Sequence, residues 1–133
     1  MIRRSLALAL LVLSLGAACA PGEGPGARTV TLTVRYSEFR PELLTVAQGS
    51  TVRFVVDNRD PIDHELIVGG PAVQRKHENG NHATHGAVPG EVSAPAGTVV
   101  ETTFTFGEPG TFLFGCHLPG HYDFGMRGEI RVV

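Results

Sequence analysis

The segment that decides the fold of this chain is TFLFGCHLPGHYDFGM, residues 111–126. A run of β-forming residues leads directly to Cys116, and a glycine-containing, turn-rich stretch separates it from Met126. The segment thereby places a thiolate, an imidazole and a thioether close together in the sequence. A soft sulfur, a borderline nitrogen and a weak second sulfur are the ligands that suit a copper ion cycling between Cu(I) and Cu(II).

The β-forming part of this segment fixes the direction of its side chains. Because successive side chains of a strand point to opposite faces, Phe112, Phe114 and Cys116 share one face. We expect the two phenylalanines to face the core and the cysteine to point inward at the end of the strand. Burial raises the pKa of a thiol, whereas a bound cation deprotonates it. The position of Cys116 therefore favours a metal ligand.

Three further candidate ligands lie within reach of this cysteine. A turn directly after Cys116 can bring His121 back toward the same metal, and a second turn through Gly125 can return Met126. Another imidazole, His64, stands upstream at the start of a separate strand-like run.

The N-terminus is typical of an export signal. Arg3 and Arg4 precede an apolar run, residues 6–15, that is too short to span a bilayer as a stable helix. Small residues and Cys19 follow, a pattern that resembles the lipobox of bacterial lipoproteins; the alternative is an ordinary secretory signal cut nearby. We expect an exported protein, in the periplasm or on the outer cell surface, anchored to the membrane by a lipid on Cys19.

This signal divides the chain into three parts. Residues 1–19 form the signal peptide, residues 20–28 a flexible linker rich in glycine and proline, and residues 29–133 one folded domain. The chain has two cysteines, so the folded domain keeps only Cys116 and cannot form an internal disulfide. An unpaired cysteine in an exported protein is a liability unless a metal protects it, which again favours a ligand.

The composition excludes one class of partner. The formal net charge is −2, and the basic residues form no run beyond the signal peptide. Nothing in this pattern indicates nucleic-acid binding.

The folded domain consists of short β-forming segments separated by turns. We predict strands over residues 29–36, 43–46, 51–56, 64–68, 98–106, 111–116 and 127–133, with Tyr36 on the apolar face of the first. No segment after the signal has a helical period. The pattern predicts an all-β, single-domain β-sandwich or barrel with Greek-key connections. Residues 69–90 interrupt it as a long, polar, histidine-containing loop insertion.

These residues together resemble the cupredoxins, the small blue-copper proteins, and most closely the bacterial plastocyanin/azurin-like members with a Cys-x4-His-x4-Met loop. The resemblance covers nearly all of residues 28–133. It implies a cupredoxin-like β-sandwich holding one type 1 copper ion. It also implies that His64, Cys116 and His121 are the equatorial ligands and Met126 the weak axial ligand.

Two positions depart from the better-known members of that family. The residue after the first histidine is often asparagine or serine, which helps to join the two ligand loops, but here it is Glu65. The second departure is His117, directly after the cysteine. Strand alternation points it away from Cys116, so we expect a surface residue or one that supports the ligands from behind. The alternative is a ligand that competes with His121 or replaces Met126.

The loop insertion carries three more histidines, His77, His82 and His85. They have two interpretations: a second, labile site for copper or zinc, or a solvated loop. Because the loop has neither a cysteine nor a rigid strand to fix a geometry, we expect the solvated loop.

The resemblance implies an exported carrier of single electrons that serves redox partner proteins. We expect no enzyme activity, because the predicted copper site has no open position for a substrate and no general base beside it. The alternative is a periplasmic or surface copper-binding chaperone or resistance protein. We expect a monomer, with transient docking of redox proteins at the apolar residues around His121, which are Leu118, Pro119, Tyr122 and Phe124. Membrane association is expected only through the lipid anchor.

Overall fold

The computed structural model describes residues 27–78, 85–86 and 88–133, so the predicted signal peptide, Cys19 and His82 lie outside the described residues. The strands are β1 (Ala27–Arg35), β2 (Glu38–Arg40), β3 (Leu43–Val46), β4 (Thr51–Asn58), β5 (His64–Gly69), β6 (Glu91–Ala94), β7 (Val99–Thr105), β8 (Gly110–Gly115) and β9 (Arg127–Val132). Helix α1 (Pro71–Glu78) lies between β5 and β6. Among the described residues, no helix has the length and apolar character needed to cross a membrane.

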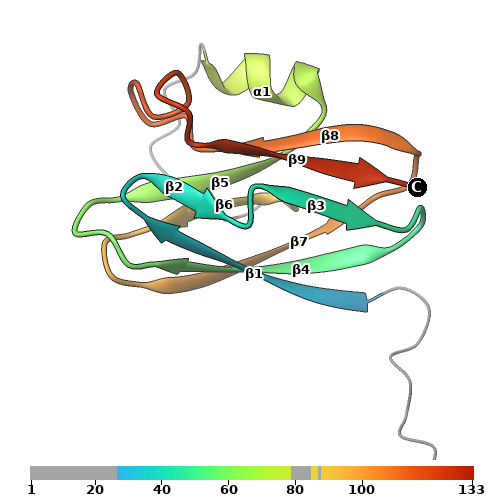
Figure 1. The fold of residues 1–133 in the computed structure, drawn as a ribbon, viewed down its shortest axis with the longest axis horizontal. Helices are drawn as coiled ribbons and strands as arrows, with labels where there is room; N and C mark the ends of the chain where they lie inside the picture. Colours follow the sequence, from blue (N-terminus) through green and yellow to red (C-terminus); the bar gives the residue numbers. More distant parts are fainter. Residues whose placement is uncertain (1–26, 79–84, 87) are drawn as a thin grey trace, which may run out of the picture.

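The strands form two sheets that pack face to face (Figure 1). The order is β2-β1-β4-β7 in the first sheet and β3-β9-β8-β5-β6 in the second. The predicted all-β sandwich is therefore confirmed, as two sheets and not as a closed barrel. Helix α1 covers the outer face of the second sheet.

The first sheet follows the alternation read from the sequence. Along β1, Val30, Leu32 and Val34 are buried, and parallel pairing sets Val30 opposite Phe54 of β4. The prediction for Tyr36 was wrong: its side chain is 78% exposed. The strand ends one residue earlier because Tyr36 and Ser37 both have a positive φ, which turns the chain back into β2.

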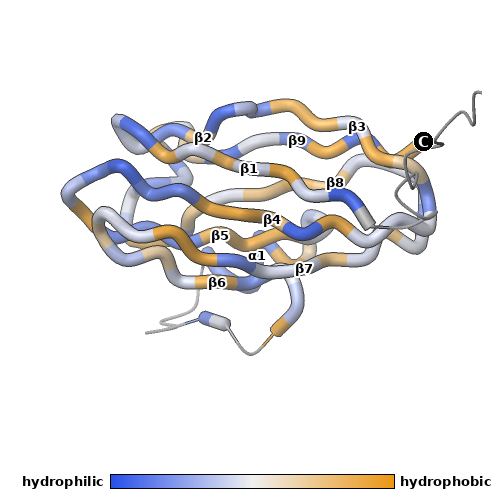
Figure 2. Tube along the Cα trace, turned by 90° about the horizontal axis from the view of Figure 1, so that it is seen from below, coloured by the Kyte–Doolittle hydropathy of each residue, from blue (hydrophilic) through white to orange (hydrophobic). Residues whose placement is uncertain are grey.

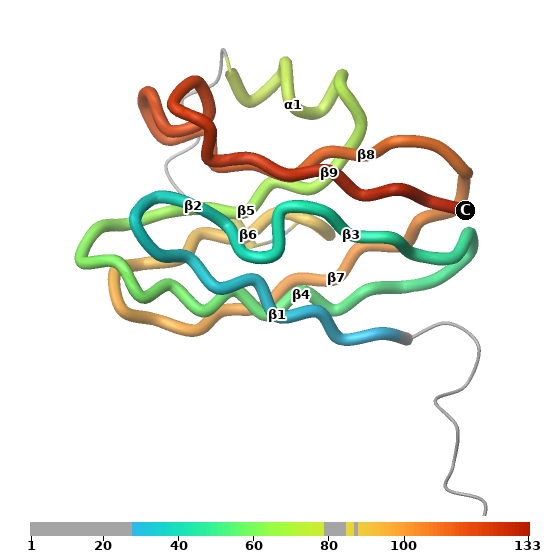
Figure 3. The backbone as a smooth tube through the Cα atoms, in the orientation of Figure 1, coloured from blue at the N-terminus to red at the C-terminus, as the bar shows by residue number. Residues whose placement is uncertain are grey.

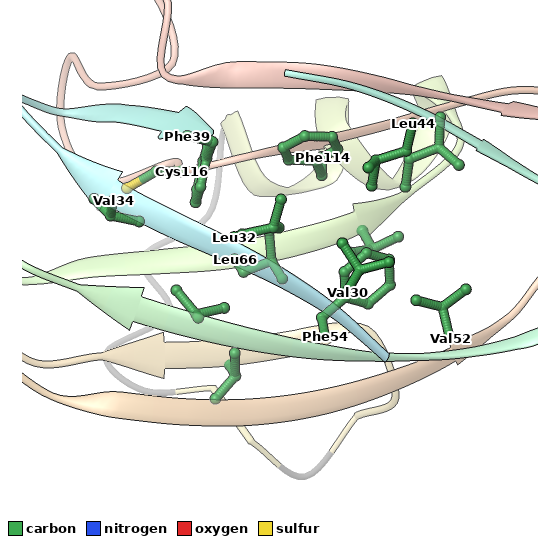
Figure 4. Packing of buried hydrophobic residues seen from close by; sticks show 14 of the residues in the cluster. Val30, Leu32, Val34, Phe39, Leu44, Val52, Phe54, Leu66, Phe114 and Cys116 are labelled. Atoms are coloured by element: carbon green, nitrogen blue, oxygen red, sulfur yellow. The ribbon is translucent and has the colours of Figure 1, made fainter. Parts of the chain in front are cut away.

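The core between the sheets is built from aliphatic and aromatic side chains. Apolar positions recur along the strands, shown in orange in Figure 2. Phe39 and Phe114 meet edge to face, as do Phe54 and Phe106, which is the favoured geometry for aromatic pairs. Cys116 belongs to the same buried cluster and lies near one end of it (Figure 4).

Strand β5 is buried on both faces, and this explains why both alternating positions are apolar in Leu66, Ile67 and Val68. Leu66 and Val68 face the core, whereas Glu65 and Ile67 alternate to the outer face, which α1 covers. Our expectation that no segment after the signal is helical was wrong. Pro71 starts the helix, where a missing N–H costs nothing, but the side chains that α1 buries, Gln74 and His77, are polar. A helix without an apolar stripe leaves no hydrophobic period in the sequence.

Candidate metal centre

Three separate pieces of chain bring potential metal ligands together at one end of the sandwich. Cys116 directly follows β8, His64 begins β5, and His121 lies in the loop between β8 and β9. The sulfur of Cys116 is 3.3 Å from Nδ1 of His121 and 4.0 Å from Nδ1 of His64, and the two imidazole nitrogens are 3.2 Å apart. These three ligand atoms face one another, as the donors around a single ion must.

Backbone hydrogen bonds shape the loop that carries His121 and Met126. The N–H of His121 donates to the carbonyl of Leu118 at 2.9 Å, closing the turn expected after the cysteine. The N–H of Met126 donates to the carbonyl of His121 at 3.0 Å, and the N–H of Cys116 donates to the carbonyl of Met126 at 3.1 Å. Met126 is therefore held beside Cys116, with its side chain buried.

An aspartate that the sequence did not single out holds His64. Oδ2 of Asp60 lies 2.9 Å from Nε2 of His64. The same carboxylate accepts hydrogen bonds from the N–H groups of Tyr36 at 2.7 Å and Ser37 at 2.8 Å. Burial opposes ionisation of Asp60, but the hydrogen bonds from Ser37, Tyr36 and His64 outweigh it, so the pKa of Asp60 lies below its usual value.

This arrangement fixes which nitrogen of His64 is free for a metal. The Asp60 carboxylate accepts the Nε2–H of His64, which leaves the Nδ1 lone pair directed at Cys116 and His121. Desolvation by burial lowers the pKa of His64, which favours the neutral imidazole that a metal can bind. Sequence reasoning missed Asp60, because it stands in the irregular segment between β4 and β5, where residue spacing does not show which side chains meet.

The thiol of Cys116 is fully buried and holds its proton in the metal-free protein. Desolvation raises the pKa of Cys116 to about 11, against a smaller opposing effect from the backbone N–H groups of Leu118 and Glu65. A cation at the site reverses this balance, because it stabilises the thiolate directly. The thiol has no disulfide partner among the described residues, as expected.

The side chain of His117 points away from this cluster, because it contacts Gln74 of helix α1. The backbone of α1 runs beside β8, the strand that leads to Cys116 and His117 (Figure 3). The backbone N–H of His117 donates to Oε1 of Glu65 at 2.9 Å. In the side chain, Nε2 lies 2.7 Å from Oε1 of Gln74, and the ring stacks on that of Tyr122 with 4.4 Å between centroids. Desolvation lowers the pKa of His117 to about 4. The Glu65 side chain thus joins β5 to the segment that follows β8. In the family, an asparagine or serine often makes this connection.

The residues expected to dock partners lie around His121. Phe124 is 93% exposed, Pro119 is exposed, and Leu118 and Tyr122 are half-buried. His121 is itself half-buried, so its ring lies at the boundary between the site and this apolar surface.

We expected the loop histidines to be solvated, and this expectation was wrong for His77 and His85. Their side chains are 3% and 4% exposed and lie against the carboxylates of Glu91 and Glu65. Potential ligand atoms of His77, His85 and Glu91 all lie within 4.8 Å of one another. These residues therefore form a second cluster of side chains whose atoms are close enough to hold one metal ion.

Comparisons with known proteins agree with the donor set of the first cluster. A family model described as copper binding proteins, plastocyanin/azurin family, matches residues 29–133. The chain is 37% identical to a copper-resistant cuproprotein, CopI, of Rubrivivax gelatinosus over 117 residues, which cover 84% of this chain and 71% of the relative. It is 26% identical to CopI of Pseudomonas aeruginosa over 98% of this chain and 97% of the relative.

Two solved structures resemble the fold. Auracyanin B has 26% identity and a TM-score of 0.68, covering 84% of this chain and 92% of its own. Auracyanin A, described as a blue copper protein from Chloroflexus aurantiacus, has 28% identity and a TM-score of 0.65, covering 81% of this chain and 100% of its own.

Proposed function

The chain belongs to the plastocyanin/azurin family of copper-binding proteins, and on that premise we propose that it carries single electrons with one type 1 copper ion. The residues that would hold the copper are His64, Cys116 and His121, together with the thioether of Met126. When bound, the ion supplies a one-electron Cu(I)/Cu(II) couple.

The observation that carries this proposal is that the protein's own hydrogen bonds and packing hold the three donors facing one another. Asp60 orients His64, the backbone hydrogen bonds of the loop orient His121, and Cys116 is immobilised in the core. A ligand set that need not move when one electron arrives or leaves suits electron transfer. The three donors are all protein side chains, and two of them are buried, so a substrate has little access to the metal. We therefore propose a carrier and not an enzyme.

The surroundings of His121 suggest where electrons enter and leave. We propose that redox proteins dock transiently on the apolar surface formed by Leu118, Pro119, Tyr122 and Phe124, because short-lived electron-transfer contacts are small. We also propose an exported, lipid-anchored monomer, from the N-terminal pattern of the sequence.

A redox titration with a self-exchange measurement tests the proposed carrier. We expect a reversible one-electron couple and fast electron exchange between the oxidised and reduced proteins. Copper that is reduced and then leaves the protein, or that exchanges electrons only after unfolding, would contradict the carrier.

Copper resistance is the second candidate function, because the relatives in Rubrivivax gelatinosus and Pseudomonas aeruginosa are named copper-resistant cuproproteins. A chaperone or resistance protein binds copper without cycling it. Rapid loss of copper to a chelator or an acceptor protein, without a reversible couple, would favour this function over the carrier.

Removal of the Asp60 carboxylate should weaken copper binding. In the Asp60→Asn variant the amide no longer provides a charged acceptor for Nε2–H of His64, so the ring is held less firmly. We expect a loss of about 10–100-fold in copper affinity and a shift in the reduction potential, measured by chelator competition and redox titration. Asp57→Asn is the matched control, because Asp57 pairs with Arg59 and not with a ligand. Equal affinities in the two variants would exclude the proposed role of Asp60.

Copper binding should release a proton from Cys116. The pKa of Cys116 is raised to about 11, so at about pH 8 the metal-free protein holds the thiol proton that the thiolate ligand must lose. The neutral His64 contributes no proton. We expect about one proton released from this thiol per copper and an apparent affinity that increases with pH up to about 11. Calorimetry in buffers of different ionisation enthalpy measures the release, and a binding enthalpy independent of the buffer would contradict it.

A further inference from the structure

We propose that the cluster of His77, His85 and Glu91 is a second metal site, specific for a borderline divalent cation of the Zn²⁺ or Cu²⁺ class. Two imidazoles and a carboxylate are the donors that such ions take, and the absence of sulfur from these three residues disfavours Cu(I). The described residues place the cluster on the outer face of the second sheet, beneath helix α1.

Strand pairing explains how the cluster forms. Antiparallel pairing of β5 and β6 sets Glu65 opposite Ser93 and Ile67 opposite Glu91. Because Val92 and Ala94 of β6 face the core, Glu91 points to the outer face, as Glu65 does. Helix α1 then lays His77 over this face, 3.3 Å from Oε1 of Glu91.

The hydrogen bonds of both histidines direct one nitrogen each toward the carboxylate of Glu91. Nδ1 of His77 lies 2.9 Å from the carbonyl of Val73, which can only accept, so Nδ1 carries the proton and Nε2 faces Glu91. Nε2 of His85 lies 3.2 Å from Oε2 of Glu65, and its Nδ1 lies 2.9 Å from Oε2 of Glu91. If Nε2–H of His85 donates to Glu65, Nδ1 is the atom that faces Glu91 and can bind the metal. Outer acceptors of this kind orient metal-binding histidines in known sites.

The charge of the cluster matches a divalent cation. The side chains of Glu65 and Glu91 are 5% and 14% exposed, so two negative charges lie close together with little solvent to stabilise them. Nε2 of His77 and Nδ1 of His85 both face oxygens of the Glu91 carboxylate, so a cation among them would contact all three side chains. A divalent cation between these groups would balance the charge of both carboxylates, which burial otherwise makes costly.

The cluster lies directly across β5 from the first site. Glu65 follows the ligand His64 in the sequence, and His117 follows the ligand Cys116, yet both side chains point toward the second cluster. The rings of His77 and His117 are 5.9 Å apart between centroids. The adjacent residues His64 and Glu65 therefore connect the two sites, and so do Cys116 and His117.

Zinc titration of the full chain, loaded first with one equivalent of Cu(II), tests this proposal. A given set of donors binds Cu²⁺ more tightly than Zn²⁺. The first site therefore keeps its copper, and the added Zn²⁺ measures binding at the second site. We expect one Zn²⁺ per chain by calorimetry and by metal analysis after dialysis, with the thiolate-to-copper absorption unchanged. No bound zinc, or zinc that enters only as that absorption disappears, would overturn the second site.

Matched variants locate the zinc. The double variant His77→Gln/His85→Gln should lose the bound zinc, whereas Lys76→Gln, an exposed change on the same helix, should keep it. Zinc retained at one equivalent by the double variant would overturn the assignment. If that variant loses its copper absorption as well, the isosteric Glu91→Gln decides: we expect a loss of at least about tenfold in zinc affinity with the copper absorption intact, and unchanged zinc affinity would overturn the site. The proposed electron-carrier function is judged separately by the redox titration.

Discussion

The Cys116→Ser variant should lose the intense thiolate-to-copper absorption completely and bind copper at least about 100-fold more weakly. The sulfur of Cys116 is the soft donor of the site, and it lies within 4.0 Å of both imidazole nitrogens. A serine hydroxyl of similar size keeps the shape of the core but remains protonated and binds copper poorly. Optical spectroscopy and chelator competition measure the two losses.

The other cysteine of the chain, Cys19, supplies the control for this experiment. Cys19→Ser makes the same chemical change outside the folded domain and should leave absorption and affinity unchanged. Circular dichroism checks that Cys116→Ser is folded. A folded Cys116→Ser protein that retained the absorption would exclude Cys116 as the ligand.

The Gly128→Ala variant should be destabilised by about 3 kcal/mol, because overpacking a closed core forces backbone and ring to move. A Cβ at Gly128 in β9 would lie 2.1 Å from Cζ of Phe114 and 2.5 Å from the backbone carbonyl of Glu42. Phe114 cannot move freely, because it is fully buried and packs edge to face on Phe39. Denaturant unfolding of the metal-free protein measures the change in the free energy of unfolding.

Gly107→Ala is the matched control for this substitution. A Cβ at Gly107 meets no heavy atom within 4 Å, so its effect should stay within about 0.5 kcal/mol. Similar unfolding midpoints for the two variants would show that β9 does not approach β8 and the segment before β3 as closely as described.

Local patterns in the sequence predicted most of the sandwich and the grouping of the first cluster. Strand β3 has the predicted bounds, and the alternation of Phe112, Phe114 and Cys116 correctly set the cysteine inward at the end of β8. These features depend on side-chain period and turn chemistry, both of which are visible in a few consecutive residues. The Cys-x4-His-x4-Met spacing was also local, and the turns that it predicted are present.

The features missed by the sequence depend on contacts between distant segments. Asp60 is recognisable only when its carboxylate is seen to join the turn at Tyr36 and Ser37 to His64. The second cluster arises because β5 pairs with β6 in a register that brings Glu65 and Glu91 to one face. A run of polar residues cannot show which strand it will cover, so the loop looked solvated.

The optical and electron paramagnetic resonance spectra of the Cu(II) protein test the central claim most directly. The claim is that one copper ion is bound by the thiolate of Cys116 together with the imidazoles of His64 and His121 and the thioether of Met126. We predict an intense thiolate-to-copper absorption together with a narrow hyperfine splitting in the protein loaded with one equivalent of copper. A fully loaded protein with no such absorption and a wide hyperfine splitting would contradict it.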